Sequence, residues 1–239
     1  MNHYQEQLCF YKDIAFHYLK YGRAYKKRHH EVVASAEIPK IIHYCWFGRG
    51  EMSDFVKKCI ASWERKMPDY KLVLWNEDNF PMEEYPFAQK ALADKKWAFV
   101  SDVARLHALY TQGGIYFDTD VEVLKSFDDL LKNGFFFGFE SRTHIQTAVM
   151  GSKMYHPFTG LLLDWYKNRN YDDFYYQTAN TRIVTRIARL YGGVKKNNQL
   201  TIFDDCVLYP RDFFCPTKRT RGYEITENTY CIHHFTRAW

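Results

Sequence analysis

The stretch FVSDVARLHALYTQGGIYFDTDVEVLKSF, residues 99–127, predicts the centre of the fold and the position of a functional site. Its first half is predicted to be a helix over 99–112, because apolar side chains recur every three or four residues: Phe99, Val103, Leu106 and Tyr110. Gly113 and Gly114 are predicted to end this helix. The alternating apolar and polar residues that follow predict a strand carrying Asp118 and Asp120.

Asp118 and Asp120 are separated by one threonine. Because successive side chains of a strand point to opposite faces, we expect both carboxylates on one face, together with Tyr116 and Glu122. Two adjacent carboxylates repel each other unless a positive charge lies between them, and a hard divalent cation is the usual partner. An isolated Asp-x-Asp is more often a solvated strand face, so a metal site here depends on the surrounding residues.

Asp102 and Arg105 lie three residues apart on the predicted helix, so they share a face and can pair opposite its apolar side. One interpretation is an ordinary surface ion pair, which contributes little to stability. The functional interpretation is that Asp102 accepts hydrogen bonds from ligand hydroxyls and Arg105 contacts phosphate or sugar oxygens. Ligands of open α/β sheets bind near the carboxyl ends of the strands, where this group would lie.

The residues before this stretch predict a parallel sheet. IPKIIHYCWFG (38–48) reads as a buried strand, Ser53 as the N-cap of a helix that Pro68 ends, and YKLVLWN (70–76) as a second strand. This is a βαβ unit. The further elements that we predict are helices at 3–25, 82–95, 157–168 and 178–191, with strands at 135–140 and near 200–208 and 229–235.

Composition bounds the class of protein. The chain has 239 residues, of which 46% are hydrophobic, enough for one sizeable core. The net charge of +5 and the pI of about 8.7 suit anionic ligands or an anionic membrane surface but fall short of a nucleic-acid-binding signature. The six cysteines have no disulfide or metal spacing, which favours buried thiols in a reducing cytoplasm. No apolar run reaches the length of a membrane span.

The N-terminal segment combines an amphipathic helix with a basic cluster. Its apolar positions are predicted to be Tyr4, Leu8, Tyr11, Ala15 and Tyr18. The cluster KKRHH (26–30) follows. The segment is interpreted either as a docking helix with a solvated charge run or as a contact with acidic lipid headgroups.

One aromatic position and a histidine pair complete the candidate residues. Trp46 ends the first strand and is either a core residue or a stacking surface for a nucleobase. His233 and His234 follow the last apolar strand and are either satisfied polar residues or metal ligands.

Four segments together resemble glycosyltransferase family 32, the DXD-containing sugar transferases of capsular and surface polysaccharide synthesis. They are IPKIIHYCWFG (38–48), SW with YKLVLWNEDN (62–79), residues 99–127 and the terminal HHFTRAW. Clostridial glucosylating toxins and yeast outer-chain mannosyltransferases resemble the chain more distantly. Two departures are Ala238, where relatives often carry Ser, and residues 180–181, which replace a Gly-Pro step.

The resemblance implies an α/β GT-A fold. A Rossmann-like nucleotide-sugar half with a mainly parallel sheet (38–127) joins a helical acceptor half with the C-terminal metal-binding segment (128–239). Residues 1–37 form a separate helical and basic segment. It also implies a retaining transfer of a hexose or N-acetylhexosamine from a nucleotide sugar, UDP-linked by preference, to a glycan or lipid-linked acceptor. The expected location is the cytoplasm or the inner face of the cytoplasmic membrane, without nucleic-acid partners.

Site residues follow from the same resemblance, position by position. Asp102, Arg105, Asp118 and Asp120 are implied to be catalytic. Mn²⁺ or Mg²⁺ would be bound by Asp118, Asp120 and His234, with His233 as the open alternative to His234. Donor-binding residues are implied to be Trp46, Ser101, Asp102, Arg105, Tyr116, Asp118 and Trp239. The alternatives are a non-catalytic nucleotide-sugar-binding module and an Asp-dependent phosphatase, against which Glu122 stands at the fifth motif position.

Overall fold

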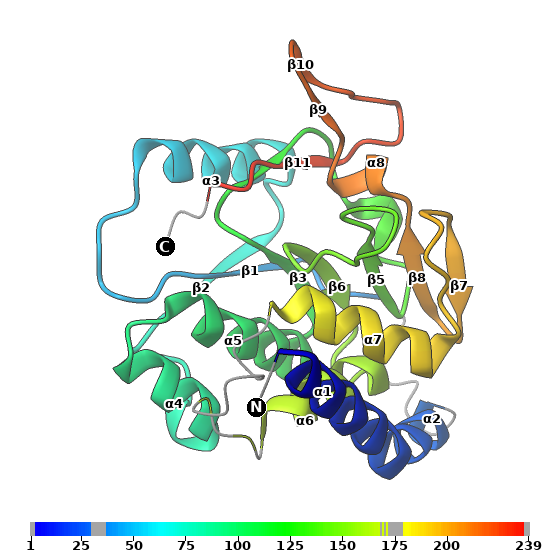
Figure 1. Ribbon diagram of the computed structural model, residues 1–239. Coiled ribbons are helices and arrows are strands. Elements are labelled where there is room, and N and C mark those ends of the chain that lie inside the picture. The colour runs from blue at the N-terminus through cyan, green and yellow to red at the C-terminus, as the bar shows by residue number, and fades with distance from the viewer. Residues whose placement is uncertain (1–2, 30–36, 168, 170, 172–178, 237–239) are drawn as a thin grey trace.

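A mixed seven-stranded sheet forms the centre of the protein. The computed structural model describes residues 3–29, 37–167, 169, 171 and 179–236. The strands of the sheet are β1 (Ile41–Cys45), β2 (Lys71–Trp75), β3 (Gly114–Phe117), β5 (Phe135–Gly138), β6 (Val149–Ser152), β7 (Thr201–Phe203) and β8 (Cys206–Tyr209). Their order is β2-β1-β3-β6-β5-β8-β7 (Figure 1). Only β6 and β7 run against the other five, so the predicted mainly parallel sheet is confirmed.

Helices cover both faces of this sheet. They are α1 (His3–His17), α2 (Arg23–His29), α3 (Asp54–Lys66), α4 (Pro86–Ala93), α5 (Trp97–Gln112), α6 (Pro157–Lys167), α7 (Asn180–Gly192) and α8 (Arg211–Phe214). A π-helical turn (Tyr18–Gly22) joins α1 to α2, and single 3₁₀ turns lie at Met82–Glu84 and Asp128–Leu130. In Figure 1, α3 lies on one side of the sheet, and α4, α5, α6 and α7 lie on the other.

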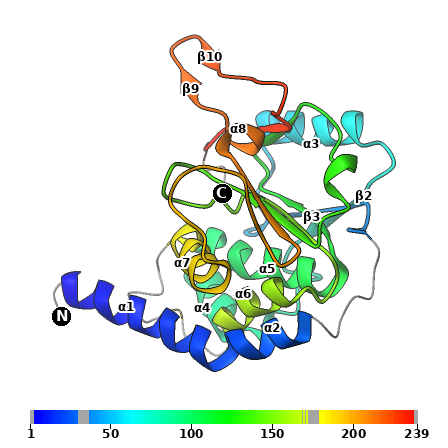
Figure 2. The same cartoon turned by 90° about the vertical axis from the view of Figure 1, so that its right-hand side faces the viewer.

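Two small antiparallel sheets complete the fold. One pairs β4 (Val121–Val123) with β11 (Cys231–His233), and the other is a hairpin of β9 (Lys218–Arg219) and β10 (Gly222–Tyr223) that projects from the body (Figure 2). In the first, Val121 pairs with His233 and Val123 with Cys231. This pairing brings the C-terminal histidines to the Asp-x-Asp motif, although more than a hundred residues separate them in sequence.

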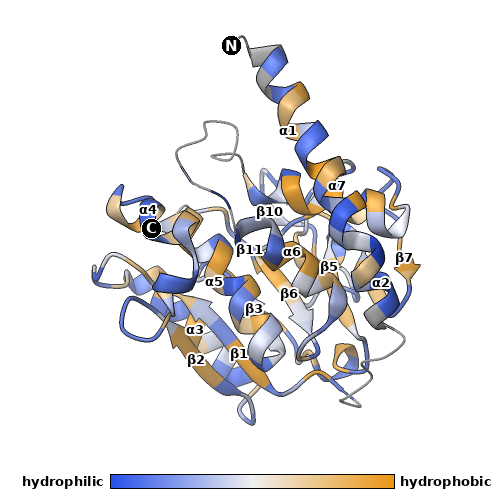
Figure 3. Cartoon of the chain, turned by 90° about the horizontal axis from the view of Figure 1, so that it is seen from below, coloured by the Kyte–Doolittle hydropathy of each residue, from blue (hydrophilic) through white to orange (hydrophobic). Residues whose placement is uncertain are grey.

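The predicted βαβ unit is confirmed. β1 and β2 pair in parallel, with Ile41 opposite Lys71 and Cys45 opposite Trp75. The Ser53 hydroxyl caps α3 by accepting a hydrogen bond from the Val56 N–H over 3.3 Å. Apolar residues colour both β1 and β2 in Figure 3, as expected for strands covered on two faces. Strand β6 was not predicted, because its four residues show no alternation of polar and apolar side chains.

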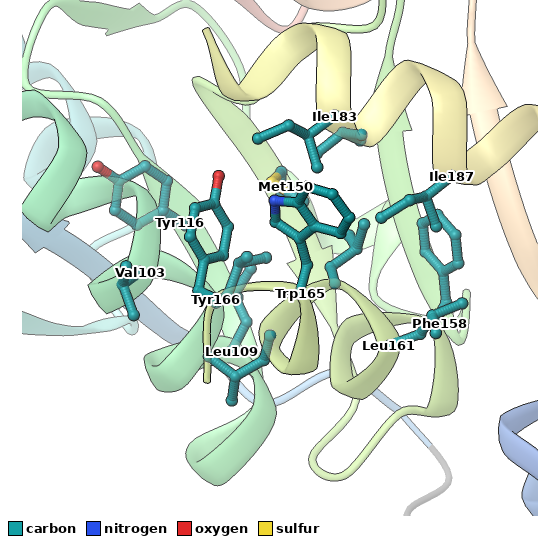
Figure 4. Close-up of a cluster of buried hydrophobic side chains, with 14 of the residues drawn as sticks. Val103, Leu109, Tyr116, Met150, Phe158, Leu161, Trp165, Tyr166, Ile183 and Ile187 are labelled. Carbon is teal, nitrogen blue, oxygen red and sulfur yellow. The ribbon is translucent and has the colours of Figure 1, made fainter. Parts of the chain in front are cut away.

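Each face of the sheet has its own hydrophobic core. On one face, side chains of α5, α6 and α7 interlock above β3 and β6, as Figure 4 shows for Tyr116, Met150, Trp165 and Ile183. On the other face, Trp63 of α3 packs against Phe117. The Trp63 indole also donates to the Val121 carbonyl over 2.7 Å, which ties α3 to β4. The Asp-x-Asp motif lies between these two cores.

The buried face of the N-terminal helix differs from the prediction. Phe10, Ile14 and His17 are buried, whereas Leu8 and Tyr11 are 44% and 37% exposed. The sequence carries apolar residues on two neighbouring faces of this helix, and packing against α7 and against Trp165 of α6 selects one of them. The helix extends beyond the body (Figures 2 and 3). Among the described residues, no helix has the length and apolar character to cross a bilayer.

A close approach of β3 to β1 explains the Gly-Gly step after α5. A Cβ atom on Gly114 would lie 2.6 Å from the Ile41 carbonyl oxygen, and the φ of Gly114 is +104°. Both conditions require glycine. The step lets β3 start directly beside β1, so that its end reaches the site.

His43 on β1 is held in its neutral form, which makes stability depend on pH. Its Nε2 donates to the Gly113 carbonyl over 2.8 Å, and its Nδ1 accepts from the Trp75 indole over 3.1 Å. Burial lowers the pKa of His43 to about 4. Because the unfolded chain takes up this proton below its ordinary pKa of about 6.5, the contribution is complete above that pH and is lost as pH falls toward 4.

We therefore expect His43→Gln to flatten the pH dependence of the free energy of unfolding. Between pH 7 and pH 4.5 the wild type should lose about 2–3 kcal/mol more than the variant. Urea titrations at the two pH values measure the difference. Equal losses in both proteins would contradict a neutral, buried His43.

Candidate active site

Helix α5 carries the first two functional side chains into the interior. Asp102 and Arg105 are 7% and 3% exposed, so the pair is not the surface ion pair that its spacing also allowed. The Arg105 Nη2 lies 3.1 Å from the Asp102 Oδ1. Helix α5 is buried on almost all sides between the sheet, α4 and α6, so the side that carries this pair also faces the interior.

Asp118 and Asp120 lie in a turn and not on one strand face, which corrects the sequence prediction. Strand β3 ends at Phe117, and the Val121 N–H donates to the Asp118 carbonyl over 3.0 Å before β4 begins. The chain turns here because β4 leaves the main sheet to pair with β11. The two carboxylates are nevertheless close and both are buried.

Arg105 contacts several of the other side chains of the site. Its Nη1 lies 3.3 Å from the Asp118 Oδ1 and donates to the Thr147 carbonyl over 2.8 Å. Its guanidinium carbon lies 4.6 Å from the centre of the Tyr116 ring, and the Tyr116 hydroxyl donates to the Asp118 Oδ1 over 2.9 Å. One cation therefore compensates two buried carboxylates and fixes the aromatic ring beside them.

Burial and neighbouring charges affect the pKa values of Asp102 and Arg105 differently. Burial raises the pKa of Asp102 to about 7, although the Arg105 charge opposes this shift. Burial would lower the pKa of Arg105, but Asp118 and Asp102 outweigh it and hold the pKa above its usual range. Asp102 also accepts a hydrogen bond from the Asn180 amide at the start of α7. The Asp102 carboxyl therefore titrates near pH 7, next to an arginine that stays positively charged.

The second carboxylate of the motif is bound by the C-terminal segment. The Asp120 Oδ2 accepts from the Thr236 N–H over 2.7 Å and from the Thr236 hydroxyl over 3.1 Å. Its Oδ1 lies 3.3 Å from the His233 Nε2. Burial would raise the pKa of Asp120, but His233 and Thr236 outweigh burial and lower it. Burial would likewise lower the pKa of His233, and Asp120 instead raises it to about 10.

The structure brings His233 to the two aspartates and turns His234 away. The His234 Nε2 lies 3.0 Å from the Glu122 Oε2, and its ring stands edge-on to Phe55. Successive residues of an extended strand point in opposite directions, which explains the split. The assignment of His234 as the third metal ligand stays a prediction, and geometry favours His233, the alternative that the sequence left open.

The remaining predicted residues lie around the same strand ends. Ser101 is buried on α5, and Tyr116 ends β3 beside Asp118. Trp46 follows β1 directly, is half-buried, and donates its indole N–H to the Gly50 carbonyl over 2.6 Å. Trp239 lies outside the described residues. The sequence did not predict Asn180, Thr147 and Thr236 as site residues. They are distant from the motif in sequence, and no local pattern marks them.

The donor set fits a hard divalent cation. Ligand atoms of Asp118, Asp120 and His233 lie within 4.8 Å of one another. Among the described residues, the buried Asp120 Oδ1 has no hydrogen-bond or ion-pair partner beyond the His233 Nε2 at 3.3 Å, and the buried His233 Nδ1 has no hydrogen-bond partner. Buried polar atoms normally have partners, so these two have capacity to spare. Two carboxylates with one imidazole suit Mn²⁺ or Mg²⁺.

A second group of possible ligands has a structural role instead. His156, Asp205 and Cys206 also lie together. The His156 Nε2, however, bonds to the Asp205 carboxylate over 2.7 Å, and its Nδ1 accepts from the Phe158 N–H. Burial raises the pKa of the Cys206 thiol well above its usual value. Both ring nitrogens of this histidine are therefore committed to the protein.

Comparison with known proteins supports the predicted resemblance. Residues 53–136 match a family model described as the glycosyltransferase sugar-binding region containing a DXD motif. The match runs from the start of α3 into β5 and contains Asp102, Arg105, Asp118 and Asp120. The resemblance to DXD-containing sugar transferases is confirmed for this region.

Curated yeast proteins match about half of the chain. Inositol phosphoceramide mannosyltransferase 3 of Schizosaccharomyces pombe is 32% identical over 138 residues, which cover 54% of this chain and 38% of that protein. Mannosyl phosphorylinositol ceramide synthase CSH1 of Saccharomyces cerevisiae is 34% identical, with 51% and 33% covered. The match thus spans little more than a third of these relatives. Their names agree with the predicted enzyme class, a glycosyltransferase.

A solved structure supports the fold. The PaToxG glycosyltransferase superposes with a TM-score of 0.52 at 16% identity, covering 76% of this chain and 79% of that chain. At this identity the likeness concerns the fold alone. The predicted GT-A fold is confirmed.

Removing the guanidinium tests its role as the shared counter-charge. We expect Arg105→Met to lower the free energy of unfolding by about 3–5 kcal/mol, because it leaves two buried carboxylates without a cation. Asp102→Asn is the matched control. Since the pKa of Asp102 is already about 7, replacing it by a neutral amide should cost about 1 kcal/mol or less at pH 7. Urea unfolding measures both variants, and equal costs would contradict the arrangement.

Proposed function

We propose that this chain, whose residues 53–136 carry the sugar-binding region of DXD-containing glycosyltransferases, is a metal-dependent, retaining glycosyltransferase. It would move a hexose or N-acetylhexosamine from a nucleotide sugar to a hydroxyl of a glycan or lipid-linked acceptor. The observation that carries the proposal is that two buried sets of ion pairs lie next to each other. In one, Arg105 pairs with Asp102 and Asp118, and in the other, Asp120 pairs with His233. Three possible metal ligands beside a buried arginine suit the diphosphate of a nucleotide sugar.

The metal supplies one part of the chemistry. Held by Asp118, Asp120 and His233, Mn²⁺ or Mg²⁺ would act as a Lewis acid on the donor diphosphate. The protein supplies the rest by position. Arg105 adds fixed positive charge where the leaving group gains negative charge, and Asp102 accepts hydrogen bonds from sugar hydroxyls. Trp46 at the end of β1 would stack on the base, and Trp239 would contact the β-phosphate.

The transfer step follows from the retaining geometry that the family resemblance implies. The acceptor oxygen bonds to the anomeric carbon on the face from which the diphosphate leaves. As the bond from the anomeric carbon to the phosphate oxygen breaks, that oxygen takes the proton of the attacking hydroxyl. Atoms and charge balance without a protein base. Burial of Arg105 lowers the local dielectric constant, which would strengthen its contacts to the leaving group.

Donor and acceptor are proposed at the level of chemical class. A UDP-linked hexose or N-acetylhexosamine follows from the family resemblance. A GDP-linked mannose is the second candidate, because both yeast relatives are named for mannosyl transfer. Their names also specify a lipid that carries an inositol phosphate, which favours a lipid-linked acceptor over a free sugar. A role in surface polysaccharide synthesis remains part of the proposal.

The exposed side of α1 supports a location at a membrane surface, on its cytoplasmic side. Phe16 of α1 and Leu19 of the π-helical turn that follows it are each 64% exposed, and Leu8 of α1 is 44% exposed. Exposed Lys12 and Lys20 lie next to them. Apolar side chains flanked by lysines are typical of helices that bind in the headgroup region of anionic bilayers.

Asp120→Ala should lower Mn²⁺-dependent donor hydrolysis and transfer by at least about 100-fold while leaving the fold intact. The assay uses UDP-glucose, UDP-galactose, UDP-N-acetylglucosamine and GDP-mannose in turn. Asp69→Ala removes an exposed carboxylate that pairs with Lys40, and serves as the charge-matched control. Wild-type rates in Asp120→Ala would contradict the proposal, and donor binding without turnover by the wild type would favour a non-catalytic module.

The same preparation distinguishes the third ligand. Titration with Mn²⁺, followed by electron paramagnetic resonance, should give a Kd at least about tenfold higher for His233→Ala, while His234→Ala should stay close to the wild type. The opposite pattern would restore the assignment of His234.

Membrane contact has an independent readout. We expect the double variant Phe16→Ser/Leu19→Ser to bind vesicles of phosphatidylcholine and phosphatidylglycerol at least about tenfold more weakly than the wild type, because it exposes hydroxyls where apolar groups would enter the headgroup region. Co-sedimentation measures binding. Unchanged binding would exclude α1 as the membrane contact.

A further inference from the structure

A surface cleft beside α7 is lined by cations that the proposed reaction does not use. It has a volume of about 310 Å³, and its lining includes Arg182, Arg186, Arg189, Lys196, His144 and Tyr11. None of the described residues that line it is acidic. We refer to it as the basic cleft. Its volume is at the lower end of the range of small-ligand sites.

Three cations of the basic cleft have no carboxylate partner among the residues that the structure describes. Within the described part of the chain, Arg186, Arg189 and Lys196 have no carboxylate within the 4.0 Å of an ion pair. The Arg186 Nε is buried without a hydrogen-bond partner. Arg105 and Arg169, by contrast, pair with the carboxylates of Asp118 and Asp13. An arginine N–H buried without a partner indicates a missing acceptor.

The helix itself does not account for this charge. Arg182, Arg186 and Arg189 follow i, i+4, i+7 spacing, so they lie on one face and repel one another. Arg189 in the last turn of α7 is favoured by the helix dipole, but Arg182 lies in the first turn, where a positive charge is disfavoured. The opposite face of α7 packs into the core through Ile183 and Ile187. An anion in the basic cleft would relieve the repulsion.

Both walls of the basic cleft lead into the donor site. α7 begins at Asn180, which bonds to Asp102, and Arg186 follows six residues later, or about 9 Å along a helix. The other wall is the loop at 143–147. There the Ile145 N–H donates to the Thr185 hydroxyl over 2.9 Å, and the Thr147 carbonyl accepts from Arg105 over 2.8 Å. A group held by Arg186 would therefore lie within two helical turns of Asn180, the hydrogen-bond partner of Asp102.

We propose that the basic cleft binds a phosphate group of the acceptor, and that the acceptor is therefore a phosphorylated saccharide or headgroup. Planar guanidinium groups match phosphate oxygens by paired hydrogen bonds, and several on one face give the selectivity for phosphate that a single lysine lacks. This assignment deepens the proposed function. It rests on that function only in identifying the phosphate as part of the acceptor. Phosphate binding itself does not depend on catalysis, so the two can fail separately.

Isothermal titration with inorganic phosphate at constant ionic strength tests the site. We expect the wild type to bind phosphate, and Arg186→Gln/Arg189→Gln to bind it at least about tenfold more weakly. Lys57→Gln/Lys66→Gln on α3 removes the same charge from exposed positions and is the control. Circular dichroism establishes that both variants fold. Absence of binding by the wild type, or equal loss in the control, would overturn the proposal.

Two further arms identify the source of the phosphate. Phosphatidylcholine vesicles with and without phosphatidylinositol test a lipid headgroup, and inositol phosphate in solution tests a free sugar phosphate. Discrimination between the vesicles that Arg186→Gln/Arg189→Gln abolishes would support a headgroup, and competition by inositol phosphate alone would support the soluble source. Metal-dependent donor hydrolysis is measured separately on the wild type. Its absence would contradict the proposed function while leaving the phosphate site intact.

Discussion

The buried guanidinium of Arg105 is the constraint on which the site depends. It compensates Asp102 on its own helix and Asp118 at the end of β3, and it binds the Thr147 carbonyl of the loop that leads to β6. Two carboxylates could not be buried at this distance without such a charge, because the cost of desolvation would exceed any packing gain. The Tyr116 ring then contacts the Arg105 guanidinium, and the Asn180 amide donates a hydrogen bond to Asp102. Helix, sheet and loop are positioned by one cation.

The second determinant is the pairing of β4 with β11. Its register sets His233 opposite Val121, and the Thr236 backbone then reaches the Asp120 carboxylate. Ser62 and Trp63 of α3 bond to the backbone of β4 and hold it away from the main sheet. The turn between β3 and β4 therefore exists because β4 has a partner elsewhere. This turn lets the two aspartates face different neighbours, with Asp118 toward Arg105 and Asp120 toward the C-terminal segment.

Much of this arrangement could be predicted from local sequence. The alternation and spacing in 38–76 and 99–117 determine strands and helices through local sterics and burial, and the Gly-Gly step after α5 has a single backbone solution. The turn at Asp118 could not be predicted, because alternation continues through Val121 and only the distant β11 ends the strand. The buried side of α1 was equally undetermined, since the partner helices choose between two apolar faces. His233 and His234 differ only by the direction of their side chains, which the register of β11 sets.

The hydrogen bond between Asn180 and Asp102 has a thermodynamic consequence. It joins the first residue of α7 to Asp102, on the proposed donor side of the site, while the same helix lines the basic cleft. A ligand that shifts or orders α7 changes the free energy of ligands at Asp102, and linkage requires the effect to be equal in the reverse direction. Donor and acceptor affinities would then be coupled through one rigid helix, so that an enzyme holding one substrate discriminates more sharply for the other.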